Sequence, residues 1–346
     1  MKFLFFITFL IFTMGSETLA QGTRINSADD IKHVALAIHG GAGNIQKRKL
    51  TPEQELAYQN VMNQALEEGY KQLLEGKPGT DVVETVIRIL EDSPLFNAGR
   101  GAVFSNEGKN EMDAAIMEGQ TLRCGAATNL RHVKNPISLV KAIMIDSQYV
   151  FLNGEGAEKF AQLKGVELVD TSYFYDEKRW NEMLKLRDST KTILDNEGRG
   201  EKDELDSISK FGTVGCVVLD AYGNLAAGTS TGGITNKRYN RIGDSPVIGS
   251  GTYANNKTCA ISCTGHGEDF IRLVAAHQVH SYMALKNKSL KKAAEKVINN
   301  ELTAIGGRGG LIGIDQKGNI TFQFNTTGMF RGSIDGKGNR FVAIYK

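Results

Sequence analysis

The hydrophobic positions of this chain divide it into short apolar runs and longer amphipathic segments. HVALAIHGGAGN at 33–44 is an apolar run that ends in glycines, which is typical of a buried strand entering a turn. Thr51, Pro52 and Gln54 predict a helix start, because a threonine N-cap, a proline at the first helical position and a glutamine at the third form a capping box. That helix is expected to run to about Leu74.

The rest of the pattern predicts further helices and several strand pairs. Helices are expected over 81–90, 137–144, 156–163, 268–285 and 290–300. Strands are expected in MDAAIMEG with TLRCGAATNL, in GTVGCVVLD with LAAGTSTGG, in KTCAISCTG and in GGLIGIDQKGNITFQFN. Because most neighbouring strands are joined by short turns, antiparallel sheets with segregated helices, an α+β fold, are favoured over a doubly wound sheet.

Two segments depart from this pattern. At the amino terminus a lysine precedes an apolar run from Phe3 to Met14, and small residues end at Ala20, which is the layout of a cleaved secretory leader. Residues 1–20 are therefore predicted to be a signal peptide and the mature chain to be periplasmic or secreted. The run is too short to span a membrane, so no membrane association is expected after removal of the leader. From about 176 to 210 the chain is dense in charge, which predicts a flexible linker.

The composition is that of an ordinary globular protein without a charge bias. The chain has 346 residues, of which 41 are lysine or arginine and 39 are aspartate or glutamate. This balance lacks the basic surplus of nucleic-acid-binding proteins, so no nucleic-acid partner is expected. Glycine is abundant, with 39 residues against five prolines, and this indicates tight turns and close backbone approaches rather than disorder.

Three short motifs have ordinary explanations. GTSTG at 228–232 matches the G-x-S-x-G pattern of a serine nucleophile, and Asp244 and His266 follow in the order of a triad, but the next residues are unsuited to the helix this motif needs. His277 and His280 stand three apart on an expected helix, and the sequence offers no third metal ligand at a suitable spacing. GGAGN lacks the third glycine of a dinucleotide fingerprint.

The step from Gly212 to Thr213 is a stronger candidate for chemistry. A threonine hydroxyl is a poor nucleophile without a base beside it. A free α-amino group on the same residue is such a base, with an unperturbed pKa of about 8. This arrangement requires cleavage before Thr213, and Gly212 suits self-cleavage because no side chain shields its carbonyl. The alternative interpretation is an ordinary strand start.

Two downstream groups complement a nucleophile that acts on an amino acid. Arg241 and Asp244 share one turn-rich loop, where an arginine fork can grip an α-carboxylate and an aspartate can bind an ammonium group. TGHG at 264–267 leaves an expected strand and opens an expected helix, where backbone N–H groups stabilise negative charge and can form an oxyanion hole. The alternatives are a surface ion pair and a helix cap.

Seven long motifs carry a family resemblance. They are HGGAGN at 39–44, PLFNAGRGAVF at 94–104, MDAAIM at 112–117, GTVGCVVLD at 212–220, TSTGGITNKRYNRIGDSP at 229–246, GTYANN at 251–256 and CTGHGEDFIR at 263–272. Over about residues 33–346 the chain closely resembles the plant-type asparaginase family, whose members are isoaspartyl peptidases and L-asparaginases among the N-terminal-nucleophile hydrolases. The resemblance implies a four-layer αββα sandwich that cleaves itself between Gly212 and Thr213. It also implies an α subunit over 21–212, a β subunit over 213–346 and a dimer of such heterodimers.

The resemblance also implies roles for individual residues. Thr213 would be the nucleophile, its freed amine the base, and Thr231 the residue that orients the hydroxyl. The other implied site residues are Arg241 and Asp244 in the substrate clamp, Gly267 beside it, Thr264 and Gly265 in the oxyanion hole, and Asn97 from the α subunit. No cofactor is implied for catalysis. A structural sodium ion is implied, held by the backbone carbonyls of Leu90, Glu91, Ser93, Phe96, Ala98 and Arg100.

The implied reaction is hydrolysis of the side-chain amide of asparagine and of β-aspartyl dipeptides. Arg241 and Asp244 would hold the α-carboxylate and α-amine that both substrates share. Thr213 would attack the side-chain carbonyl, and water would release aspartate from a β-aspartyl-threonine ester. A glycosylasparaginase with the same chemistry is an alternative, although Gly212 and the TGGITNK loop favour the isoaspartyl branch. An amino-acid-binding protein that does not cleave its ligand is an alternative from another class.

Overall fold

A computed structural model of the chain describes residues 34–47, 50–195 and 212–346, with no side chains described for 188–195. The segment predicted to be a signal peptide lies outside these residues. The larger of two sheets has the strand order β12 (Arg340–Tyr345), β11 (Gly328–Ile334), β1 (Ala35–Gly43), β5 (Val214–Leu219), β6 (Leu225–Thr231), β2 (Met112–Glu118), β3 (Cys124–Leu130) and β4 (Phe151–Asn153). Its neighbours pair antiparallel, except the parallel pair β3–β4.

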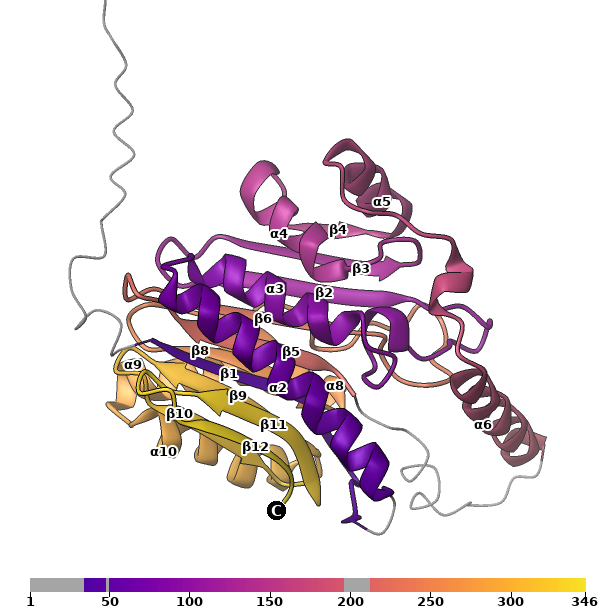
Figure 1. Ribbon diagram of the computed structural model, residues 1–346. Helices are drawn as coiled ribbons and strands as arrows, with labels where there is room; N and C mark the ends of the chain where they lie inside the picture. The colour runs from indigo at the N-terminus through magenta and orange to yellow at the C-terminus, as the bar shows by residue number, and fades with distance from the viewer. Residues whose placement is uncertain (1–33, 48–49, 196–211) are drawn as a thin grey trace, which may run out of the picture.

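The smaller sheet is antiparallel and packs on one face of the larger sheet (Figure 1). Its strands are, in order, β10 (Ile320–Phe324), β9 (Gly309–Asp315), β8 (Cys259–Gly265) and β7 (Thr252–Ala254). The contacts between the sheets run mainly from β8 and β9 to β1, β5 and β6. The hairpin-linked antiparallel strands expected from the sequence are confirmed by these pairings.

Helices cover the outer faces of both sheets. On the larger sheet and its edge lie α2 (Pro52–Leu74), α3 (Gly79–Glu91), α4 (Pro136–Asp146) and α5 (Gly154–Leu163). On the smaller sheet's side lie α8 (Gly267–Leu273), α9 (Ala275–Lys286) and α10 (Leu290–Glu295), which continues into a π-helix over Lys296–Leu302. The remaining elements are α6 (Glu177–Asp195) and 3-10 helices at Gly99–Gly101 and Thr171–Phe174.

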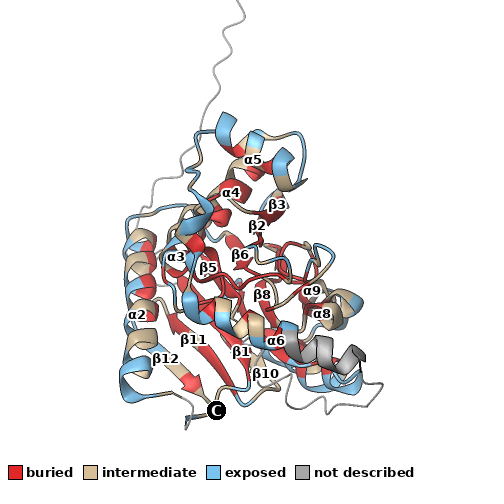
Figure 2. Cartoon of the chain, turned by 90° about the vertical axis from the view of Figure 1, so that its right-hand side faces the viewer, coloured by how far each residue is buried: buried red, intermediate tan, exposed pale blue. Residues whose placement is uncertain are grey.

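Alternation along the strands sends side chains to two separate cores, and most of the larger sheet is coloured as buried in Figure 2. On β1, Leu36 and Ile38 join the core beneath α2 and α3, whereas Ala35 and Ala37 join the core between the sheets. All four side chains are fully buried or nearly so. The next inward position on β1 is His39, and the layer between the sheets becomes polar there.

The structure confirms the predicted start of α2 and alters two other expectations. Thr51 and Gln54 form the expected capping box. The helix expected over 268–285 is instead two helices, because Val274 adopts a left-handed conformation with φ of 49°. The flexible linker predicted over about 176–210 is helical in its first part, α6, and residues 196–211 lie outside the described residues. Within the described residues, every helix is too short or too polar to cross a membrane.

Candidate active site

Thr213 lies at the entrance to β5, with its side chain on the face that meets the smaller sheet. Its Oγ1 donates a hydrogen bond to Oγ1 of Thr231 at 3.0 Å, on the neighbouring strand β6. The same Thr231 oxygen accepts the backbone N–H of Gly233 at 3.0 Å. Both threonines are buried. Thr231, which the sequence predicts to orient the nucleophile, is therefore in direct contact with the Thr213 hydroxyl and is itself fixed by a loop amide.

Asn97 joins the predicted cleavage junction to the loop after β6. Its backbone N–H donates to the carbonyl of Gly212, and its backbone carbonyl accepts from the N–H of Gly232, each at 3.0 Å. Its side-chain amide donates to the carbonyl of Gly233 at 2.6 Å and accepts from the N–H of Val103 at 3.0 Å. A Cβ at Gly212 would lie 2.9 Å from Cβ of Asn97. Glycine is therefore required for this close approach.

The carbonyl of Thr213 is held from the opposite side by a buried histidine. Nδ1 of His39 lies 3.0 Å from this carbonyl oxygen, and Nε2 lies 2.9 Å from Oγ of Ser262 on β8. Burial lowers the pKa of His39 to about 3, so the imidazole is neutral at physiological pH. Its Nδ1 must carry the proton, because a carbonyl only accepts.

Arg241 and Asp244 meet at Gly267, the first residue of α8. A Cβ at Gly267 would lie 2.9 Å from both Nη2 of Arg241 and Oδ1 of Asp244, so only glycine leaves the space between them open. Burial raises the pKa of Asp244 to about 6, and within the described residues its Oδ2 has no hydrogen-bond partner. Such a carboxylate is prepared to receive a cationic group.

The guanidinium of Arg241 already holds a carboxylate. Its Nε and Nη2 donate to the two oxygens of Glu268 at 2.7 and 2.6 Å. This bidentate pair shows that the fork is oriented for carboxylate recognition. The hydrogen bond from Arg241, together with its charge, holds the pKa of the half-buried Glu268 at about 2 despite the opposing effect of burial.

Thr264 and Gly265 are the last two residues of β8, and both pair with residues of β9. Thr264 is completely buried, and its Oγ1 has no hydrogen-bond partner among the described residues. It stands two residues beyond Ser262, on the same face of the strand, and so faces the larger sheet. Gly265 has a φ of 157°, and a Cβ there would lie 2.4 Å from the carbonyl oxygen of Arg308. A buried hydroxyl with a free hydrogen-bonding capacity fits the predicted oxyanion hole.

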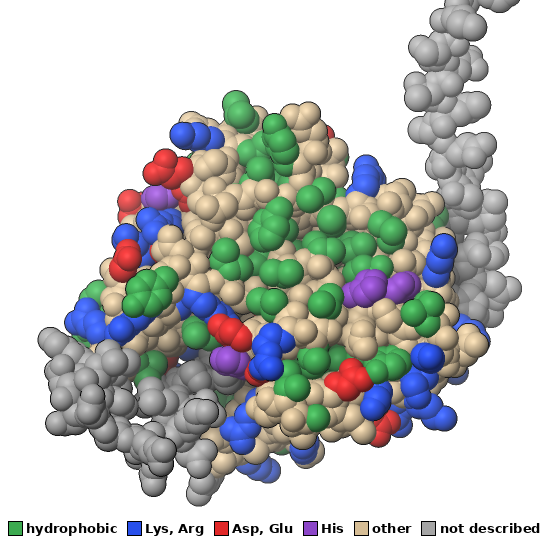
Figure 3. Space-filling view, turned by 180° about the vertical axis from the view of Figure 1, so that it is seen from behind, with side chains coloured by type: hydrophobic (Ala, Val, Ile, Leu, Met, Phe, Trp, Pro, Cys, Tyr) green, Lys and Arg blue, Asp and Glu red, His purple; other side chains and the backbone are tan. Residues whose placement is uncertain are grey.

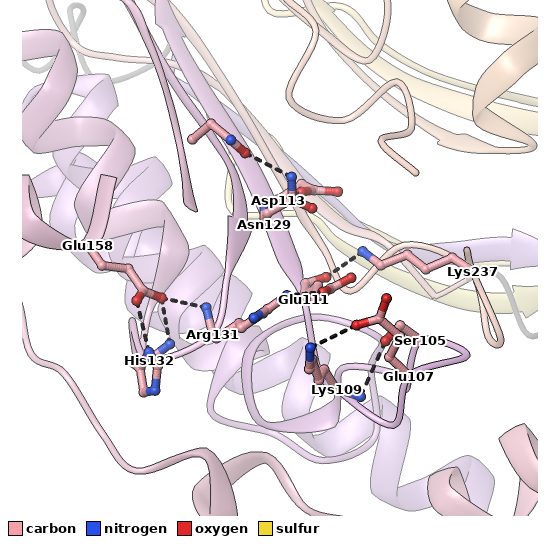
Figure 4. Close-up of polar contacts among 11 residues, drawn as sticks. Ser105, Glu107, Lys109, Glu111, Asp113, Asn129, Arg131, His132, Glu158 and Lys237 are labelled. Carbon is pink, nitrogen blue, oxygen red and sulfur yellow. Dashed lines mark hydrogen bonds and ion pairs between the residues drawn. The ribbon is translucent and has the colours of Figure 1, made fainter. Parts of the chain in front are cut away.

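A buried aspartate, Asp113, and a buried lysine, Lys237, lie close to β2 (Figure 4). Asp113 is paired with Thr231 across strands β2 and β6, and its Oδ1 accepts the backbone N–H of Asn129 at 2.9 Å. The ammonium of Lys237 donates to the backbone carbonyl of Glu111 at 2.7 Å. Lys237 is 3% exposed and Asp113 fully buried, and burial lowers the pKa of the lysine while it raises that of the aspartate. These contacts tie the TGGITNK loop to β2.

The residues of the serine-triad pattern are not assembled. Ser230 stands between Thr229 and Thr231 on β6 and therefore points to the helix side of the sheet. His266 contacts Asp269 and Glu268, at 3.1 and 3.3 Å.

His277 and His280, whose ring centroids are 5.2 Å apart, have Ser281 and Thr258 as hydrogen-bond partners. Among the described residues, no group of three histidine, cysteine or acidic side chains is placed to hold a metal.

The loop between α3 and β2 holds the residues for which a carbonyl-bound sodium ion is predicted. A Cβ at Gly99, where φ is 51°, would lie 2.5 Å from the carbonyl oxygen of Glu91. A Cβ at Gly101 would lie 2.0 Å from the carbonyl oxygen of Phe96. The two glycines therefore allow the chain to pass close to these carbonyl oxygens. The sodium site over Leu90–Arg100 stays a prediction.

Comparison with known proteins identifies the family. Residues 32–344 match the family described as asparaginase. The chain belongs to this family. It is 46% identical over 296 residues to an isoaspartyl peptidase of Escherichia coli, covering 86% of this chain and 91% of that protein. It is 42% identical over 326 residues to a putative isoaspartyl peptidase/L-asparaginase of Dictyostelium discoideum, covering 88% and 94%. It is 39% identical over 302 residues to a plant-type L-asparaginase of Pyrococcus furiosus, covering 86% and 94%.

These matches confirm the predicted family of this asparaginase and correct its predicted location. The periplasmic or secreted location is contradicted by well-matched relatives from Escherichia coli, Dictyostelium, Arabidopsis and Pyrococcus. The family match begins at residue 32, after the leader-like segment on which export was predicted. An exported enzyme is therefore the wrong expectation for this chain.

Several polar residues of the candidate site give no clear functional signal in the sequence. His39 and Ser262 were assigned to buried strands, and Glu268 to an ordinary helix. Their contacts join residues that are 174, 223 and 27 positions apart in the chain. The one available signal was a histidine at the end of an apolar strand, directly before two glycines.

Proposed function

We propose that this asparaginase hydrolyses the side-chain amide of asparagine and of β-aspartyl peptides with Thr213 as its nucleophile. The observation that carries the proposal is the assembly around this one residue. Its hydroxyl contacts Thr231, its carbonyl contacts His39, and the carbonyl just before it contacts the N–H of Asn97. The names of the matched relatives, isoaspartyl peptidase and L-asparaginase, agree with this substrate class.

Self-cleavage between Gly212 and Thr213 would create the base. The Thr213 hydroxyl attacks the Gly212 carbonyl, the peptide bond becomes an ester, and water then hydrolyses the ester and leaves a free α-amine on Thr213. The N–H of Asn97, 3.0 Å from the Gly212 oxygen, is placed to stabilise the negative charge that develops there. The freed amine then takes the proton of the Thr213 hydroxyl in each later turnover.

The charged residues account for recognition of an amino-acid end. Arg241 would exchange Glu268 for the α-carboxylate of the substrate, and Asp244 would bind the α-ammonium with its unpartnered oxygen. Thr264 and Gly265 would then face the oxygen of the scissile carbonyl. Thr213 forms a β-aspartyl ester while ammonia or an amine leaves, and water releases aspartate. These steps need no cofactor.

The layered arrangement supports the finer predictions for the fold. Helices, large sheet, small sheet and helices follow one another, which agrees with the αββα sandwich of N-terminal-nucleophile hydrolases. We propose an α subunit ending at Gly212, a β subunit beginning at Thr213 and a dimer of these heterodimers. The back face carries many hydrophobic side chains (Figure 3), as a surface that packs against a second copy would. The glycosylasparaginase and binding-protein alternatives gain no specific support.

The proposal is tested by Thr213→Ala with Ser230→Ala as its matched control. Ser230 is a buried residue on β6, next to Thr231, and its hydroxyl lies on the face of the sheet opposite to Thr213. Wild type and Ser230→Ala should each give two bands on a denaturing gel, the smaller beginning at Thr213, and both should hydrolyse a β-aspartyl dipeptide. Thr213→Ala should give one band and no hydrolysis. Hydrolysis by the uncut Thr213→Ala protein would disprove the assignment.

A further inference from the structure

The carbonyl of Thr213 lies just beyond the part of the sheet that could hold it. Strands β1 and β5 pair from Ala35 with Leu219 to His39 with Gly215, and the pairing stops there. The pairing of β1 with β11 also shifts register between His39 and Ala42. The imidazole of His39 replaces the missing backbone donor by reaching the Thr213 carbonyl with Nδ1.

The proton positions behind this contact follow from the chemistry of the partners. With its proton on Nδ1, His39 must accept at Nε2, so the Ser262 hydroxyl donates to it across 2.9 Å. The single Ser262 proton is then used, so Thr229 donates to Ser262 across 2.6 Å. Thr252 has one hydroxyl proton, and its Oγ1 lies 2.7 Å from Oγ1 of Thr229 and 3.0 Å from the carbonyl oxygen of Ser245. The direction of the hydrogen bonds is therefore fixed from Thr229 through Ser262 and His39 to the carbonyl of Thr213.

The contact between His39 and Ser262 leaves no room for a side chain at Gly215. A Cβ at Gly215 would lie 2.1 Å from Oγ of Ser262 and 2.2 Å from Nε2 of His39. Any side chain at this position, two residues after Thr213, would therefore break the central contact. The four hydrogen-bonded side chains are fully buried, so water does not substitute for a lost partner without rearrangement. This requirement explains why Gly215, the second glycine of the GTVG motif, is a glycine.

We propose that His39, with Ser262, Thr229 and Thr252 behind it, is a positioning residue that fixes the main chain of Thr213 for catalysis. This inference rests on the proposed function, in which Thr213 is the nucleophile. After cleavage, Thr213 keeps a peptide bond on its carboxyl side alone, and its carbonyl becomes the fixed point from which both the hydroxyl and the amine project. His39 thus acts through Thr213 and does not touch the substrate.

The test compares His39→Leu with His39→Asn in the full chain. Leucine fills a similar volume without a donor, whereas the asparagine amide nitrogen stands near the place of Nδ1. Ile38→Val, on the opposite face of β1, is the control for a loss of packing. Each protein is followed for the rate of self-cleavage on a gel, for kcat and KM on a β-aspartyl dipeptide, and for its thermal unfolding midpoint.

His39→Leu should cleave itself more slowly and lose about tenfold or more in kcat, as expected for one essential hydrogen bond, with KM nearly unchanged. His39→Asn should recover most of both rates, and Ile38→Val should match wild type in kcat. Ser262→Ala removes a single hydroxyl, should lower kcat in the same way, and decides the test alone if His39→Leu does not fold.

Two results would overturn the inference. One is wild-type kcat and cleavage in a folded His39→Leu or in Ser262→Ala, and the other is a loss in His39→Asn as large as that in His39→Leu. Failure of the proposed function is seen separately, because wild type itself would then remain uncut or inactive. Protonation of His39 does not contribute to the pH dependence of kcat, since burial keeps His39 neutral over the pH range of the assay.

Discussion

The layer between the two sheets has an apolar half and a polar half built on the same strands. The inward positions change within two residues on three strands: Ala37 to His39 on β1, Val217 to Gly215 on β5, and Ala227 to Thr229 on β6. Both halves are equally buried (Figure 2). The apolar half is held by packing, which has no direction, whereas the polar half is held by hydrogen bonds whose donors and acceptors are fixed one by one.

This difference separates stability from turnover. A packed methyl group can shift slightly and keep most of its contacts, but a donor that loses its acceptor in a buried site loses the whole interaction. Changes in the polar half should therefore act on kcat, and changes in the apolar half on the free energy of unfolding. The predictions below test this separation.

Among the residues around Thr213, the largest effect on turnover is expected from Thr264→Val. Valine keeps the shape of the side chain and removes the buried Oγ1 that has no partner among the described residues. Loss of one oxyanion donor should lower kcat by about 100-fold to 1,000-fold, with self-cleavage retained. Thr321→Val, a buried threonine on β10, is the matched control and should leave kcat unchanged. An effect on KM alone would contradict the assigned role.

A somewhat smaller loss is expected from Asp244→Asn. The amide preserves the shape of the side chain but cannot neutralise the ammonium group of the substrate. The value of kcat/KM should fall by about 100-fold, mainly through a higher KM, because one partner of a buried charge pair is lost. Steady-state kinetics on asparagine would measure this, and gel analysis should show normal self-cleavage. A drop in kcat at unchanged KM would place Asp244 in the chemical step instead.

The pH dependence should show the same residue. The pKa of Asp244 is raised to about 6 by burial, so below that pH the carboxyl gains a proton and no longer attracts an ammonium. The amine that the proposed self-cleavage would free on Thr213, with an ordinary pKa of about 8, must also be unprotonated to act as the base. The slope of log kcat/KM should therefore steepen from about one to about two below pH 6. Asp244→Asn should keep the shallower slope at all acidic pH values.

The smallest effect on turnover belongs to the apolar half. Leu219→Ala removes a buried side chain of β5 that packs between the sheets. The free energy of unfolding should fall by about 2–5 kcal/mol through lost burial and the cavity that remains. The kcat of the folded enzyme should not change. Chemical denaturation of Leu219→Ala in the uncut Thr213→Ala background, which unfolds as one chain, measures the first quantity, and a loss of kcat in the cut Leu219→Ala enzyme would mean that the two halves are not separate.

The fold was largely predictable because its signals are local. The capping box at Thr51 and Gln54 and the hairpin strands depend on residues within one turn of each other. Two departures have a different origin. Val274, a β-branched residue at φ of 49°, breaks a helix where the next turn donates backbone N–H groups to the carbonyls of Gly249 and Ser250, and these distant partners give no local signal in the sequence. The helix α6 forms in a charged segment, where Trp180 packs edge-on against Phe104 from a distant loop.

The sequence points to candidate site residues where they lie in long motifs and not where they lie inside apolar strands. Thr213, Arg241 and Asp244 stand out beside glycines and turns. His39 and Ser262 resemble core positions, since their partners come from strands that meet only after folding. Glu268 was passed over for a related reason, because its contact with Arg241 crosses from a loop to a helix.

The strand order of the larger sheet has a consequence for the life of the molecule after a cut at Gly212. Strand β1, from the first piece, is clasped between β5 and β11 of the second piece. The two subunits would stay associated through the pairing of these strands as long as the protein remains folded. Once unravelled by heat or denaturant, however, they would have to find each other by diffusion, and the enzyme could not easily be rebuilt from its own mature parts.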